Sequence, residues 1–278
     1  MRTILTTSWW VSKNKADLAW IEPQVVGGRV DLKVVSGQRT GNPPVAPKVG
    51  RGASFTYLGC GSLIGETSLI SQGLRGELGL RMTCVVSERD GRRSYRAPDP
   101  DDTEAADSVV VPDDVPDLAL PNIPRWFSGP RFGFTTQADL YTSRQLITHT
   151  IVADLIGALP RRIVNDGGDQ QWADAVTTIL ALSLGKMIQV ASTLAIWRHE
   201  PTPKAEAALS SHSLPMMWDF PEVFPFGGSV GDWMGQVKTA CRAFALLPGG
   251  GLPSARVVNL DCSSGPGLRG RASAKKPS

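Results

Sequence analysis

Hydrophobic and polar residues follow one pattern in the first third of this chain and another in its second half. Residues 18–35 hold two runs rich in Val and Ile, LAWIEPQVV and RVDLKVV, joined by Gly27 and Gly28. Such a pair of runs predicts a β-hairpin, and Pro23 favours an edge position for its first strand. Strand-like segments also cover residues 53–64 and 80–87. We therefore expect a small, turn-rich β region at the start of the chain.

The stretch RFGFTTQADLYTSRQLITHTIVADLI, residues 131–156, opens the helical part. Thr142 and Gln145 have the spacing of a capping box at a helix start, and Gly157 is a candidate stop. Apolar residues recur at every fourth position after the cap, at Ile147, Ile151 and Leu155, and are flanked by Val152 and Ile156. This periodicity predicts a helix with these residues on one buried face.

Two more helices are predicted further along, with Asp169 and Asp232 as N-caps. The first carries apolar residues at helical spacing: Trp172, Val176, Ile179, Leu180, Met187, Ile188 and Ala191. The second carries another such set: Trp233, Val237, Cys241 and Phe244. Glycines at 249–251, an apolar run at 255–260 and Asp261 follow. Helix, glycine loop, apolar strand and acid in this order are typical of a Rossmann-like α/β unit.

Proline and acidic residues separate the two halves. Residues 97–130 contain seven prolines and a run of aspartates, a composition that predicts a linker. We therefore expect an α+β to α/β protein with a β-rich region at 1–96, a linker at 97–130 and a helical, partly α/β region at 131–262. The basic, apolar-poor residues 263–278 are expected to be a disordered tail.

Composition narrows the function only slightly. Of the 278 residues, 41% are hydrophobic, which suffices for a core, and a net charge of +3 gives weak support for a nucleic-acid partner. Four cysteines are scattered without a Cys-x-x-Cys pair, and no signal peptide or long apolar run is present. These features predict a reduced, cytoplasmic protein that does not enter a membrane.

Two aromatic residues and a lysine lie close together near the start of the chain. Trp9, Trp10 and Lys13 could stack on nucleic-acid bases, and tryptophans in this position also form the core of small domains, so both interpretations stay open. The histidines show neither metal spacing nor a partnered nucleophile, and no hydrolase triad is predicted.

Several short motifs resemble one known family. Residues 138–146, ADLYTSRQL, are similar to the segment GDLFTPRQL of adenine-specific DNA methylases that contain an internal zinc ribbon. Residues 172–176 and 214–220 are similar to that family's YADAV and IPMVWDF. Pairs and turns of the same family also occur here in the same order: Trp9-Trp10, Gly27-Gly28 and Gly50-Arg51-Gly52-Ala53.

The resemblance implies a fold and a set of site residues. The fold would be a degenerate zinc-ribbon-like region followed by a partial Rossmann-like methyltransferase region. Cys60 falls on the last zinc ligand, but Tyr57 replaces its partner, and zinc needs four ligands that one cysteine cannot supply. Asp219 and Asp261 would contact S-adenosylmethionine, and Arg144 would contact DNA. For both aspartates a purely structural role, as a cap or an exposed strand end, is the alternative.

Two further motifs imitate catalytic pieces of such an enzyme. Residues 42–45, Asn-Pro-Pro-Val, copy three positions of the loop that holds the flipped adenine, but Val45 has no ring to stack on it. Residues 57–62 imitate a strand followed by a Gly-x-Gly turn, and Gly65 then interrupts the helix that should follow. An ordinary turn is the alternative for each motif, so no catalytic residue is assigned.

The resemblance implies an activity only for the whole family member. This chain matches an interior piece, because the cofactor glycine turn lies upstream of the matched part and the catalytic loop downstream. The hypothesis is a truncated S-adenosylmethionine-dependent adenine-specific DNA methyltransferase that is inactive alone. The alternatives are a non-catalytic DNA-binding or interaction module, and a subunit of a split methylase that needs a complementing polypeptide.

Overall fold

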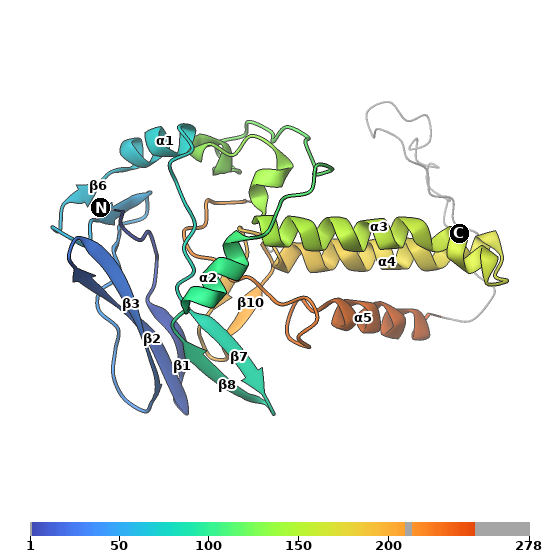
Figure 1. The fold of residues 1–278 in the computed structure, drawn as a ribbon, viewed down its shortest axis with the longest axis horizontal. Helices are drawn as coiled ribbons and strands as arrows, with labels where there is room; N and C mark the ends of the chain where they lie inside the picture. Colours follow the sequence, from blue (N-terminus) through green and yellow to red (C-terminus); the bar gives the residue numbers. More distant parts are fainter. Residues whose placement is uncertain (1, 209–212, 248–278) are drawn as a thin grey trace, which may run out of the picture. The chain divides into compact units, whose positions relative to one another are not determined.

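The fold is mixed α+β, with small antiparallel sheets and five α-helices in the part of the chain that the structure describes (Figure 1). This structure is a computed structural model and describes residues 2–208 and 213–247. Residues up to Cys241 form one compact unit, and residues 242–247 belong to a second. The α+β prediction is confirmed. The Rossmann-like strand at 255–260, with its glycines and Asp261, lies outside the described residues.

The first sheet is antiparallel and has the order β1-β2-β3. Its strands are β1 (Trp10–Asn14), β2 (Asp17–Val26) and β3 (Arg29–Gln38). Gly27 and Gly28, with φ of 52° and 79°, make the turn between β2 and β3, as two adjacent glycines at a hairpin predict. The predicted edge position of the first hairpin strand is wrong, because β2 is central. Pro23 is tolerated since β1 pairs with β2 only as far as Trp20, so beyond that point β2 has a neighbour on one side.

A hairpin of two strands lies against this sheet and helps to close its core. It consists of β7 (Val85–Arg89) and β8 (Arg92–Arg96), and the Ser36 hydroxyl of β3 donates a hydrogen bond to the Tyr95 carbonyl of β8. Tyr95 is buried in one cluster with residues of β1 and β2 and their flank: Trp9, Val11, Ala19 and Ile21.

A second small sheet joins the β region to residues that follow position 129. It contains β4 (Lys48–Val49), β5 (Ser54–Thr56) and β6 (Leu63–Ile64), followed by α1 (Glu66–Leu74). The ring of Trp218 lies edge-on to Phe55 and to Phe132, with ring centroids 5.1 Å apart in both pairs. Phe132 belongs to the short 3-10 helix η1 (Gly129–Phe132). Aromatic packing therefore connects three segments that are distant in sequence.

Glycine permits the close approach of α1 and η1. A Cβ atom on Gly73 would lie 2.3 Å from the carbonyl oxygen of Phe132, and one on Gly133 would lie 2.2 Å from the carbonyl oxygen of Gly73. Gly133 also has a φ of 95°, which favours glycine. Any side chain at either position would push the two backbones apart.

The segment at 97–130, predicted as a linker, contains regular structure. Helix α2 (Pro100–Asp107) begins at a capping box, in which the backbone N–H groups of Asp99 and Asp102 donate to each other's carboxylates at 2.9 Å. Proline in the first turn and acids near the N-terminus stabilise a helix start. Phe127 is buried and forms a bridge with Leu214. The aspartates that suggested a linker therefore serve partly as helix caps.

The two long helices α3 (Ser143–Asn165) and α4 (Gln170–Val190) lie side by side as an antiparallel pair (Figure 1). The predicted capping box is present, since the Thr142 N–H donates to Gln145 Oε1 at 3.0 Å and the Gln145 N–H donates to Thr142 Oγ1. Gly157 does not end α3, which continues to Asn165. Asp169 accepts from the Trp172 N–H at 2.7 Å and so caps α4 as predicted.

The predicted buried face of α3 is confirmed only for its flanking residues, Val152 and Ile156. Ile151 and Leu155, which were predicted to be buried, are 51% and 66% exposed. The buried positions are centred on another side of the helix: Gln145, Leu146, His149, Val152 and Ile156. Val152 and Ile156 pack against Leu184 and Met187 of α4 in one cluster. Both stripes are apolar at helical spacing, and contact with α4 decides which of them is covered.

The remaining described elements are a short hairpin and a helix. The hairpin has the strands β9 (Ile196–Arg198) and β10 (Lys204–Glu206), and α5 spans Trp233–Ala245. A further 3-10 turn, η2, covers Gln137–Leu140. Among the described helices, α4 alone has the length and mean hydropathy, 1.3, that a membrane span requires, a criterion that core helices also meet.

Candidate nucleic-acid interface

The tryptophans predicted to stack on bases have different surroundings. Trp9 is only 1% exposed, and its Nε1–H donates to the Val45 carbonyl at 3.3 Å. A ring buried to this extent has no free face for a base, so Trp9 serves the core. Trp10 is half-buried and lies edge-on to Trp20 at 5.8 Å, with Lys13 Nζ 5.7 Å from its ring centroid. Trp10 and Lys13 are therefore the members of this set that reach the surface.

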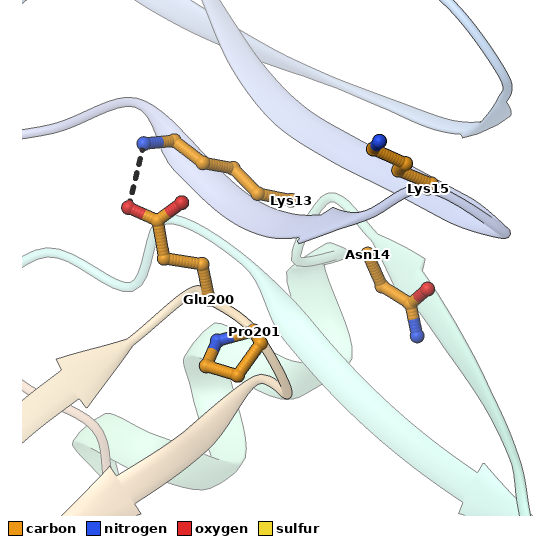
Figure 2. Close-up of a pocket in the computed structure, with 5 residues that line it drawn as sticks. All are labelled: Lys13, Asn14, Lys15, Glu200 and Pro201. Carbon is orange, nitrogen blue, oxygen red and sulfur yellow. Dashed lines mark hydrogen bonds and ion pairs between the residues drawn. The ribbon is translucent and has the colours of Figure 1, made fainter.

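Lys13 lines a shallow hollow of about 530 Å³ at the end of the β1–β2 hairpin. Figure 2 shows the Lys13 and Glu200 side chains pointing toward one another, with Asn14 and Lys15 further along the same hairpin. The distance from Lys13 Nζ to Glu200 Oε1 is 3.1 Å. Pro201 completes the lining. The hollow therefore combines two cations, one amide and one carboxylate.

Backbone and side-chain hydrogen bonds fix the two walls of the hollow against each other. The Lys13 N–H donates to the His199 carbonyl at 2.8 Å, and Trp197 Nε1–H donates to the Val11 carbonyl at 2.9 Å. Burial, together with the neighbouring Lys13, lowers the pKa of His199 below its usual value. His199 is therefore uncharged near neutral pH, and Lys13 and Lys15 are the positive groups lining the hollow.

Charge is unevenly divided along the chain, which the near-neutral total conceals. Residues 1–96 contain 14 Lys and Arg against seven Asp and Glu, whereas residues 97–278 contain 15 against 19. One excess of positive charge therefore lies in the β-rich region, and a second lies in residues 263–278, which contain four Lys and Arg and no Asp or Glu. Such a local excess attracts polyanions even when the net charge of the whole protein is small. Counting the charged residues of each region separately would have revealed this excess of Lys and Arg from the sequence alone.

Arg144, predicted to contact DNA, is engaged within the protein. Its Nε–H donates to Glu222 Oε2 at 2.8 Å, and Nη1–H donates to the Ala106 carbonyl at 2.9 Å. The hydrogen bond to Glu222 raises the pKa of Arg144. The side chain also lines a second hollow of about 570 Å³ beside Arg81 and Asp107. In this arrangement Arg144 ties α3 to α2 and to the segment that contains Glu222.

Of the two predicted cofactor contacts, the structure describes Asp219. Asp219 Oδ2 accepts hydrogen bonds from Thr6 Oγ1 at 2.8 Å, from the Thr7 N–H at 3.0 Å and from Thr7 Oγ1 at 2.8 Å. Its carboxylate therefore fastens the start of the chain to the segment of Trp218. Asp261 lies outside the described residues.

Cys60, the predicted residual zinc ligand, lies in the turn between β5 and β6. Its thiol is exposed and lies 3.1 Å from Ser62 Oγ, and this hydrogen bond lowers the pKa of Cys60. The turn is closed by two backbone hydrogen bonds of 2.8 Å: the Tyr57 N–H donates to the Ser62 carbonyl, and the Gly61 N–H donates to the Tyr57 carbonyl. Within residues 2–208 and 213–247, no group of three or more His, Cys, Asp or Glu side chains is placed to hold a metal ion.

The two motifs that imitate catalytic pieces occupy turns. Val45 is 94% exposed, and its carbonyl accepts the hydrogen bond from Trp9. Gly61 has a φ of 75° and belongs to the β5–β6 turn, and no helix begins there. The ordinary-turn interpretation fits both segments.

Comparison with known proteins adds no assignment. No protein-family model, no curated protein and no solved structure matches the chain. Sequence reasoning missed Asn14, Lys15 and Glu200 as members of the hollow. Lys15 follows Lys13 by two residues, which is a local signal, but Glu200 is separated from Lys13 by 187 positions and carries no motif.

Proposed function

We propose that this protein binds DNA through its β-rich region, residues 1–96, and that it derives from the adenine-specific DNA methylases. The observation that carries the proposal is the concentration of positive charge in this region, next to the half-buried ring of Trp10 and the hollow of Lys13 and Lys15. Lysine and arginine side chains neutralise phosphates and release counterions, which is the main source of affinity for DNA regardless of sequence.

The methylase ancestry is proposed from the sequence motifs. The same proposal includes a Rossmann-like arrangement over residues 131–262 and a cytoplasmic location. The residues present do not fit S-adenosylmethionine, because the Asp219 carboxylate already accepts hydrogen bonds from Thr6 and Thr7. The isolated chain is therefore proposed to bind DNA without transferring a methyl group, and a single cysteine at position 60 is proposed not to hold zinc.

A second candidate function, a subunit completed by another polypeptide, is favoured by one observation. Several large apolar side chains on α3 and α4 are more than half exposed: Ile151, Leu155, Trp172 and Leu182. Ile151 and Leu155 lie one helical turn apart on α3, and exposed apolar neighbours are typical of faces that other proteins cover. Co-purification of a partner that buries these residues would support this function, and a monomer that stays soluble at high concentration would count against it.

DNA binding is tested by fluorescence anisotropy with a labelled duplex of about 20 base pairs at increasing salt. We expect the logarithm of the association constant to fall linearly with the logarithm of the salt concentration, with a slope of about −0.9 for each phosphate neutralised. Absence of binding at low salt would contradict the proposal. A methyl-transfer assay on the same duplex is expected to give no product, and turnover by the isolated chain would contradict the proposed inactivity.

A further inference from the structure

We propose that the hollow at the end of the β1–β2 hairpin is a phosphate subsite, and that Glu200 covers it until a DNA phosphate displaces the carboxylate from Lys13. The inference rests on the proposed DNA binding and adds a location and a competing group to it. The occupant is one phosphodiester of the DNA backbone, in contact with Lys13.

The hairpin turn beside Lys13 is held by its own hydrogen bonds. The Asn14 N–H donates to Ser12 Oγ at 3.2 Å, Asn14 Oδ1 accepts from the Ala16 N–H at 3.0 Å, and Ser12 is fully buried. The Asn14 amide nitrogen and the Lys15 ammonium have no hydrogen-bond or ion-pair partner within residues 2–208 and 213–247. Figure 2 shows the ends of both side chains lying apart from the Lys13 ammonium, so we expect them to contact neighbouring phosphates of the same DNA backbone.

Glu200 is suited to act as a displaceable cover. Its side chain is 59% exposed and that of Lys13 is 31% exposed, and ion pairs of this exposure are weak. The second neighbour of the carboxylate, His199 Nε2, lies 3.8 Å from Glu200 Oε1. Because His199 is uncharged near neutral pH, it adds no ionic bond to hold Glu200 in place. A phosphate can therefore take over Lys13 at little cost, and the carboxylate can turn into solvent.

Trp10 distinguishes a nucleic acid from a free anion at this position. Lys13 lies over the Trp10 ring at 5.7 Å, so a phosphate bound to Lys13 would bring its sugar or an unstacked base close to the indole. Inorganic phosphate has no group to place there. Aromatic rings beside a cation are typical of surfaces that follow a nucleic-acid backbone.

The test uses the full chain and four variants in the anisotropy assay. Glu200→Gln keeps the shape of the side chain and removes its charge, and Lys13→Gln removes the cation. The double variant combines both. Glu77→Gln is the matched control, because Glu77 forms an exposed ion pair with Arg75 at 2.7 Å and its loss changes the net charge by the same amount.

We expect Glu200→Gln to tighten duplex binding about threefold, because the carboxylate no longer competes with the phosphate for Lys13. Lys13→Gln should weaken binding and flatten the salt slope by about 0.9, which corresponds to the loss of one phosphate contact. In the Lys13→Gln background, Glu200→Gln should give no gain beyond that of Glu77→Gln. Equal gains in duplex affinity from Glu200→Gln and Glu77→Gln would overturn the proposed subsite but not the proposed DNA binding. A gain that persists in the double variant would overturn it as well.

One further outcome distinguishes a DNA phosphate from free inorganic phosphate as the ligand of the hollow. Another distinguishes failure of the subsite from failure of the proposed DNA binding. Inorganic phosphate at millimolar concentration should not displace the duplex, and displacement that depends on Lys13 would assign the hollow to a free anion instead. Absence of binding by the wild type and by every variant would overturn both the subsite and the proposed function.

Discussion

The sheet β1-β2-β3 and the helix pair α3–α4 differ in how completely this chain covers their apolar residues. Trp9, Val11 and Ile21 in and beside the sheet are at most 6% exposed. On the helices, Ile151 and Leu182 are 51% and 68% exposed, although their residue types are as apolar. Apart from Val25 and Val26 at the end of β2, which are 46% and 58% exposed, the apolar residues of the sheet are covered, whereas the helix pair presents more apolar surface that the described residues leave open.

The two regions also differ in charge: the helix pair has more exposed apolar surface, and the β-rich region has more positive charge. The β-rich region carries an excess of Lys and Arg, while residues 97–262 have more Asp and Glu. A basic surface suits a polyanion, and an exposed apolar surface suits a protein partner. The comparison thus assigns different kinds of partner to the two regions, which the average composition of the chain hides.

The largest expected effect contrasts one tryptophan from each region. Trp9→Ala should lower the free energy of unfolding by about 3–5 kcal/mol, because it removes a fully buried ring. Trp172→Ala should cost less than about 1 kcal/mol, because that ring is 62% exposed. Urea unfolding measures both values. Equal losses would show that the two tryptophans are covered to the same extent.

A smaller effect depends on pH and concerns the buried start of the helix pair. Burial lowers the pKa of His149 from 6.5 to about 4, and its Nε2 has no hydrogen-bond partner among the described residues. Between these pH values the unfolded chain binds a proton that the folded chain does not bind. The free energy of unfolding should therefore fall by up to about 3 kcal/mol as the pH drops through this window.

His149→Leu isolates this contribution from that of the carboxylates. Unfolding is measured at pH 7 and pH 4.5 for both proteins, and the loss on acidification should be smaller in the variant. An identical pH dependence would mean that His149 is accessible to protons in the folded state, and the start of α3 would then be as open as the rest of the pair.

The smallest expected effect is on the open face itself. The double substitution Ile151→Ser and Leu155→Ser should change the free energy of unfolding by less than about 0.5 kcal/mol, since both side chains are already in solvent. Val152→Ala is the matched control on the covered face of the same helix and should cost about 2 kcal/mol. A large loss from the double substitution would show that this face is covered.

Local signals in the sequence predicted the elements better than their packing. Thr142 and Gln145 identified the start of α3, and Gly27 and Gly28 identified a turn, because capping and glycine turns depend on residues within a few positions. The buried face of α3 was predicted only in part, at Val152 and Ile156, because two apolar stripes compete and contact with α4 decides between them. Asp99 and Asp102 were interpreted as linker residues, although their spacing with Pro100 is that of a helix start.

The candidate site shows the same limit. Trp10 and Lys13 are neighbours in sequence and were found together. Glu200 reaches Lys13 only through the backbone contact between Lys13 and His199, which no pattern in the sequence encodes. Asp219 was predicted as a cofactor contact because it lies in a motif. Its hydrogen bonds to Thr6 and Thr7 join residues more than 200 positions apart, so the sequence does not reveal them.

Hydrogen exchange of the full chain, with and without a saturating DNA duplex at low salt, tests most directly whether DNA binds the β-rich region. We expect slower exchange on DNA addition at the ends of β1 and β2 around Lys13 and Lys15, and unchanged exchange along α3 and α4. Protection of α3 and α4 with no change in the β1–β2 hairpin would contradict this expectation, and would place the DNA on the region assigned here to a protein partner.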